Sequence, residues 1–181
     1  RVDALSVVMI WLVAFLGAFL VQFSRNYLDG DARQAVFLSR LCLTIAAVFL
    51  FVLAGNLWQL VAAWIMMSFA LHRLLIFYDD RPRAIRSARK KFIVARIGDI
   101  CLIAAAILIA PATGTTDIGQ IAAMTETMLA DGTIPFSLSA AAVLIAIAAI
   151  LKSAMFPLHG WLLEVMETPT PVSALLHAGL L

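Results

Sequence analysis

Long runs of apolar residues, each closed by a short polar segment, recur along the chain. A run of about 20 apolar residues has the length that an α-helix needs to cross a hydrocarbon core of about 30 Å. The pattern predicts five such spans and the start of a sixth, at residues 4–24, 36–53, 57–78, 92–110, 136–166 and 171–181. We therefore expect an all-α fold, a polytopic bundle of transmembrane helices.

Composition supports the same fold class. Hydrophobic residues make up 64% of the chain and charged residues 13%, whereas a soluble domain is about half apolar and about a quarter charged. The two cysteines lie inside apolar runs and lack the spacing of a disulfide or metal site. The chain begins at Arg1 and ends at Leu181 within an apolar run, so we expect an internal piece of a longer protein.

The fifth apolar run is too long for one simple crossing. Residues 136–166 would form a helix of about 46 Å at about 1.5 Å per residue. A break near Pro157 within the membrane removes the excess and leaves Lys152 inside the bilayer. Broken helices at this depth line cavities and mark ion pathways. The alternative is that Lys152 lies at a helix end and extends its ammonium to the headgroups.

The distribution of Lys and Arg predicts the orientation. Residues 79–91 contain six basic side chains and residues 25–35 contain Arg25 and Arg33, whereas residues 111–135 contain no Lys or Arg. Since short cytoplasmic loops carry the excess of positive charge, we expect loops 25–35 and 79–91 in the cytoplasm and loop 111–135 outside. In this interpretation the basic loop at residues 79–91 determines the orientation of the helices, or it binds a cytoplasmic partner or anionic lipid. No feature of the sequence indicates binding to a nucleic acid.

Several other ionisable residues lie within or beside the spans. Arg96 and Asp99 are three residues apart and share a helix face, so they form either an interfacial salt bridge or a buried pair that biases a proton path. His72 and Arg73 precede the end of the third span. Arg73 can extend to the interface, and His72 is either a proton relay or a histidine held by ordinary hydrogen bonds.

Two further histidines follow Lys152. His159 and His177 lie on either side of the sequence ETPTP. Each hop of a proton needs a group that can both accept and donate it, so Lys152, His159 and His177 are candidates for one proton pathway. A nucleotide-binding loop, a metal-spaced Cys/His cluster and a serine-nucleophile motif are missing from the sequence.

The segment LKSAMFPLHGWLLEVMETPTPVSALLHA (residues 151–178) resembles the signature of the proton-conducting, antiporter-like membrane subunits. These are the L, M and N subunits of respiratory complex I and the large subunits of Mrp sodium/proton antiporters. The segments KKFIVARIGD, VDALS and YLDGDARQAVFLSRL are similar to other parts of the same family. The resemblance covers nearly the whole chain and implies an antiporter-like fold with a discontinuous helix, of which this chain is a part.

The resemblance also implies roles for particular residues. Lys152 would be the central proton-carrying residue, His177 would lie on the next broken helix, and Asp99, paired with Arg96, would influence the charge of Lys152. The family pattern has a glutamate directly after a tryptophan on the third span, as the partner of the lysine. Here Trp64 is followed by Ile65, so Asp99 is the best remaining carboxylate.

The segment LHRLLIFYDDRPRA is closer to the DabB branch, the membrane subunits of two-part inorganic-carbon accumulation systems in bacteria. This resemblance implies a cation-conducting subunit in the bacterial inner membrane, carrying protons or alternatively sodium. It would power the hydration of CO2 to bicarbonate by a large zinc protein of the DabA type, similar to β-carbonic anhydrases, on the cytoplasmic side. The zinc would belong to that partner, and no cofactor is expected in this chain.

Two other interpretations stay open. One is a proton-translocating subunit of a complex I-type or Mrp-type assembly, against which Ile65 counts. The other is a scaffold that keeps the fold and moves no ion, against which the presence of Lys152, His159, His177 and Asp99 counts.

Overall fold

A computed structural model describes residues 3–77, 82–153 and 170–175. Its elements are helices, and the described residues form no strand. The helices are α1 (Ala4–Tyr27), α2 (Gln34–Val52), α3 (Leu57–Leu75), α4 (Pro82–Thr113), α5 (Ile118–Ala130), α6 (Phe136–Lys152) and α8 (Thr170–Leu175). The expected all-α helical bundle is therefore confirmed.

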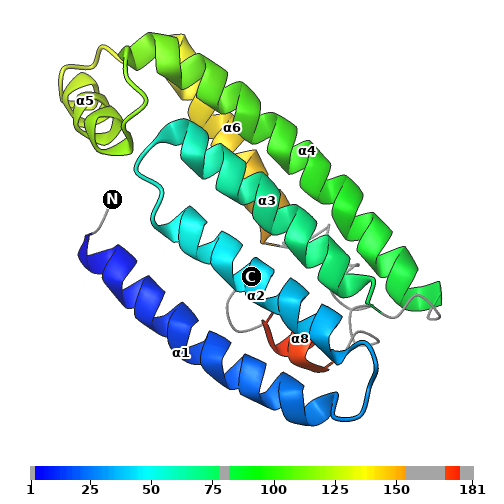
Figure 1. Ribbon diagram of the computed structural model, residues 1–181. Helices are drawn as coiled ribbons and strands as arrows, with labels where there is room; N and C mark the ends of the chain where they lie inside the picture. The colour runs from blue at the N-terminus through cyan, green and yellow to red at the C-terminus, as the bar shows by residue number, and fades with distance from the viewer. Residues whose placement is uncertain (1–2, 78–81, 154–169, 176–181) are drawn as a thin grey trace.

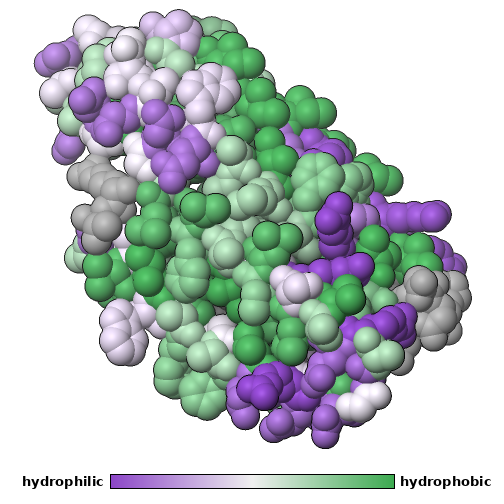
Figure 2. Space-filling model, viewed as in Figure 1, coloured by the Kyte–Doolittle hydropathy of each residue, from purple (hydrophilic) through white to green (hydrophobic). Residues whose placement is uncertain are grey.

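Among the described residues, four helices are long and apolar enough to cross a membrane: α1, α2, α3 and the part of α4 from Ala88 to Thr113. The shorter α6 is also apolar. Successive long helices pack side by side, and α6 packs along α4 (Figure 1). In Figure 2 the middle of the visible face is mainly hydrophobic, and hydrophilic residues gather toward its two ends. This distribution matches a bilayer core between two aqueous surfaces.

Two loops join at the end of the bundle where α5 lies (Figure 1). The Leu57 amide donates to the Thr116 carbonyl at 2.8 Å, and the Ile118 amide donates to the Gly55 carbonyl at 3.0 Å. The Asn56 side chain accepts a hydrogen bond from the Trp58 amide and so caps the first turn of α3. These bonds fix the start of α3 relative to α5. The segment between α4 and α6 contains the short helix α5.

The fourth helix begins ten residues earlier than expected. Residues 79–91 were predicted to be a loop, whereas α4 starts at Pro82. Proline is favoured at a first helical position, and the Ala, Arg and Lys residues that follow have high helix propensity. Hydropathy detects only the part of a helix that lies in the apolar core, so it missed this basic extension.

The described part of the fifth span forms α6. α6 ends at Lys152, and Ser153 caps it with an amide that donates to the Ala149 carbonyl at 2.9 Å. The expected break at Pro157 lies outside the described residues. Lys152 therefore occupies the last turn of α6, where the helix dipole favours a cation.

Gly98 allows α4 and α6 to approach each other beside the charged residues described below. A Cβ atom at Gly98 would lie 3.7 Å from both the Ala148 carbonyl oxygen and the Leu151 Cβ. A methyl group thus reaches ordinary contact distance, and a larger side chain has no space.

We predict that Gly98→Ala keeps or raises the stability of the full-length protein in detergent, because alanine is the better helix former. Gly98→Leu should destabilise it by about 1–3 kcal/mol, because the added atoms overpack the contact. Thermal unfolding of both variants in one detergent checks this. Equal melting temperatures for the two variants would contradict the close approach of α4 and α6.

Candidate functional site

Lys152 points from α6 into the contact between α3 and α4. Its Nζ donates a hydrogen bond to Ser68 Oγ at 3.0 Å and lies 4.4 Å from the centre of the Trp64 ring. Ser68 is only 3% exposed. An ammonium over the face of an indole is stabilised by the negative charge of the ring face. The lysine thus ends among protein side chains of α3 and does not extend away from the bundle.

The contact lies well inside the bundle along the helix axes. Ser68 is about 16 Å from the start of α3 at Leu57 and about 10 Å from its end at Leu75, taking about 1.5 Å per residue. By the same measure Asp99 lies about 16 Å from Ala88 along α4. Both positions are therefore far from the ends of the apolar segments, as expected of a site within the membrane.

Arg96 and Asp99 form an ion pair on α4. Arg96 Nη2 lies 2.7 Å from Asp99 Oδ2, and the Asp99 side chain is 5% exposed. The Arg96 guanidinium also lies over the rings of Phe69 and Phe92, at 4.2 and 4.8 Å. These contacts place the pair inside the α3–α4 interface, which agrees with a buried pair better than with an interfacial bridge.

Lys152 and Asp99 interact through space and not by direct contact. Each contributes to the electrostatic field at the other. Within the described part of the chain, however, no nitrogen–oxygen distance of 4.0 Å or less joins them, and Lys152 forms no ion pair. Asp99 is therefore a neighbour of Lys152, but the direct partner of Asp99 is Arg96.

His72 continues the same face of α3. Trp64, Ser68 and His72 follow one another at intervals of four residues, so they form one line along the helix. The His72 ring lies 4.5 Å from the ring of Phe92. Arg73, the next residue, has an exposed side chain and donates nothing to the cluster; its carbonyl accepts from Arg40 Nη1 at 2.9 Å. The structure brings His72 to the site and leaves Arg73 outside.

Lys91 also belongs to the site, although its sequence pattern does not indicate this. It was counted in the basic loop, whereas it is 8% exposed on α4 and interacts electrostatically with His72, Arg96, Asp99 and Lys152. Lys90 beside it is exposed. Lys91 and Asp99 are eight residues apart, on one face of a helix. A helix predicted from Pro82 would have revealed this.

Buried polar atoms without a well-aligned hydrogen bond concentrate at this site. Among the described side chains they are Trp64 Nε1, His72 Nδ1, Arg96 Nε and Nη2, and both Asp99 carboxylate oxygens. Buried polar groups are usually paired, and unpaired ones often belong to sites that bind water or ions. The described residues include no group of three His, Cys, Asp or Glu that could bind a metal. His159 and His177 lie outside the described residues.

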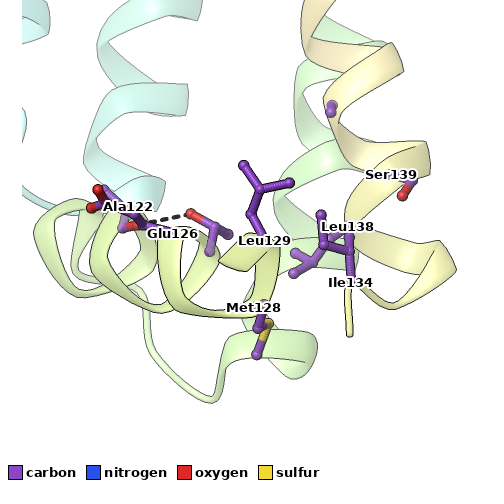
Figure 3. A pocket seen from close by; sticks show the side chains of 9 residues that line it. Ala122, Glu126, Met128, Leu129, Ile134, Leu138 and Ser139 are labelled. Carbon is purple, nitrogen blue, oxygen red and sulfur yellow. Dashed lines mark hydrogen bonds between the residues drawn. The ribbon is translucent and has the colours of Figure 1, made fainter. Parts of the chain in front are cut away.

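A separate hollow of about 430 Å³ lies between α5 and the first turns of α6 (Figure 3). Leu129 of α5 and Leu138 of α6 are part of its mainly apolar lining, and its polar members are Thr125, Glu126 and Ser139. Ser139 is about 20 Å from Lys152 along α6 at about 1.5 Å per residue. The hollow is therefore distinct from the charged cluster.

Comparison with known proteins identifies the family. Residues 54–181 match the transmembrane family described as NADH:quinone oxidoreductase/Mrp antiporter, and residues 1–38 match the N-terminus of complex I chain 5. A solved Mrp complex from Dietzia sp. superimposes with a TM-score of 0.87 at 30% identity, over 98% of this chain and 19% of that one.

Individual relatives come from two kinds of assembly. The probable inorganic carbon transporter subunit DabB2 of Halothiobacillus neapolitanus is 47% identical over 99% of this chain and 32% of its own length. The corresponding DabB of Hydrogenovibrio crunogenus is 39% identical over 99% of this chain and 34% of its own. Subunit 5 of the chloroplastic NAD(P)H-quinone oxidoreductase of Zygnema circumcarinatum is 34% identical over 98% of this chain and 26% of its own length.

The chain thus spans about a third of the length of the DabB relatives. The resemblance to the antiporter-like membrane subunits and the expected all-α fold are both confirmed. This chain belongs to the NADH:quinone oxidoreductase/Mrp antiporter family of membrane subunits.

Proposed function

We propose that the protein to which this chain belongs is a membrane subunit that conducts a cation, a proton in the first instance and sodium as the alternative. The observation that carries the proposal is the position of Lys152, whose ammonium contacts Ser68 and Trp64 between α3, α4 and α6. Ionisable groups inside a membrane are costly, and they typically belong to ion or proton pathways.

The other groups of the cluster suit a proton path. Lys152, Lys91 and His72 can each accept and donate a proton, and all three face the α3–α4 interface. The Arg96–Asp99 pair places a fixed charge pattern beside them. The buried polar atoms of Asp99, Trp64 and His72 lack a well-aligned hydrogen bond, so they are suited to bind water that links these groups. His159 and His177, which follow Lys152 in sequence, would continue the path.

We further propose that the transported cation powers inorganic-carbon accumulation. Support comes from the two relatives named as probable inorganic carbon transporter subunits, at 47% and 39% identity, against 34% for the quinone oxidoreductase subunit and 30% for the Mrp structure. The partner would be a large zinc protein similar to β-carbonic anhydrases. The structural match to the Mrp complex favours the second candidate, a proton-translocating subunit of a complex I-type or Mrp-type assembly.

The proposed location is the bacterial inner membrane. The N-terminal end of α4 has the exposed basic residues Arg86, Arg89 and Lys90, and the segment 111–135 has neither Lys nor Arg. By the positive-inside rule the start of α4 faces the cytoplasm and α5 faces the outside. The zinc partner would then bind on the side where α4 begins.

We predict that Lys152→Met in the full-length subunit, purified with its partner and reconstituted in liposomes, lowers proton flux by about 100-fold or to the level of empty liposomes, because a positioned proton carrier is lost. A pH-sensitive dye inside the liposomes measures the flux. Lys90→Met is the matched control, since Lys90 is exposed on α4, and it should keep the wild-type rate. Undiminished flux in Lys152→Met would contradict the proposed pathway.

The carbon-accumulation role has its own test in cells. The full-length gene, expressed with its neighbouring partner gene, should restore growth in air to a bacterium that lacks carbonic anhydrase. Lys152→Met and Asp99→Asn should abolish the rescue, because each removes an ionisable group of the cluster. Wild-type flux in liposomes without rescue of growth would favour the complex I-type or Mrp-type assembly.

A further inference from the structure

The helix that faces Lys152 offers it no carboxylate. The α3 sequence LWQLVAAWIMMSFALHRLL contains no Asp or Glu. Ile65, one turn before Ser68, packs in an apolar cluster with residues of α4 and α6. What α3 places against the ammonium is a neutral hydroxyl at 3.0 Å and an aromatic face at 4.4 Å.

Ser68 differs from three other buried hydroxyl residues of the described helices, Ser24, Thr44 and Thr113. A Ser or Thr inside a helix commonly donates its hydroxyl to the carbonyl one turn earlier. Ser24, Thr44 and Thr113 all do this, with Leu20, Arg40 and Ile109 as acceptors. The Ser68 hydroxyl instead accepts from Lys152 of another helix. Its lone pair is thus directed at the ammonium across the α3–α6 contact.

We propose that Ser68 and Trp64 are positioning residues that hold Lys152 through neutral contacts and thereby set the pH range in which it exchanges its proton. The proposal rests on the proposed function and names how that site is regulated. A hydroxyl and an indole face stabilise the ammonium less than an adjacent carboxylate would. Lys152 is therefore held in place, and its ammonium releases a proton more readily than it would beside a carboxylate.

Among the described residues, the charged neighbours of Lys152 lie farther from its ammonium than Ser68 does. Asp99 and Arg96 of α4 act on it through space. Lys91 of α4 interacts with Lys152, and His72 of α3 interacts with Lys91. The charges of these groups act on Lys152 from a distance and are the same in every Ser68 variant that stays neutral. Ser68, in contrast, is in direct contact with the ammonium. A change at Ser68 should therefore change the pH response of Lys152 without removing any charge from the cluster.

The test is proton flux against pH for the full-length subunit with its partner in liposomes. In Ser68→Ala the ammonium loses its acceptor, so the half-maximal point on the alkaline side should fall by about one pH unit. Ser68→Asp supplies a carboxylate and should move the same point upward. Ser68→Thr keeps the hydroxyl and should restore the wild-type profile. Ser139→Ala, whose side chain lines the separate α5–α6 hollow, is the control.

Opposite shifts for Ser68→Ala and Ser68→Asp support the inference, since a general loss of folding cannot produce them. An unchanged midpoint in both variants, while Lys152→Met abolishes flux, overturns the inference and leaves the proposed function standing. Full flux in Lys152→Met overturns the proposed function itself. If the Ser68 variants do not insert, Trp64→Phe and Trp64→Leu decide: Phe should keep the midpoint and Leu should lower it, and equal midpoints would refute the role of the aromatic face.

Discussion

The contact between Lys152 and Ser68 is the interaction on which the arrangement of the other groups depends. A cation inside an apolar bundle is costly unless polar partners are in place. Here the end of α6, the hydroxyl of Ser68 and the ring of Trp64 supply them together. The contact requires α6 to pack closely on α4 and still reach α3, and the small residue Gly98 allows that approach.

The bundle separates its polar and apolar contacts along the same three helices. Toward α5, residues such as Leu57, Leu102 and Leu138 form an apolar cluster between α3, α4 and α6. Beyond it, Lys152, Asp99 and His72 form the polar region. This apolar cluster holds the three helices together on the α5 side of the polar region.

Much of the fold was predictable because apolar runs record directly which segments cross a bilayer. The start of α4 could not be predicted in this way, because the first turns of the helix are basic and show no apolar run. The burial of Lys91, which lies in this part of α4, could therefore not be predicted either. Lys152 and the Arg96–Asp99 pair could be selected because charge within an apolar run is itself unusual. Ser68 could not be selected from the sequence, because the hydroxyl of a serine in a membrane helix usually donates to a carbonyl of its own helix. Only the position of α6 shows that the Ser68 hydroxyl accepts from Lys152. Arg73 was selected from the sequence but does not belong to the site, because its side chain near the end of α3 is exposed.

The central claim is that Lys152 itself gains and loses a proton during conduction. The most direct measurement is ¹⁵N NMR of the lysine side chains of the full-length subunit in a bilayer, with the Lys152 signal assigned by its loss in Lys152→Met. We expect this signal to change between the ammonium and amine forms over the pH range in which proton flux through the same sample falls. A Lys152 signal that remains in one form across that whole range, while flux rises and falls, would contradict it.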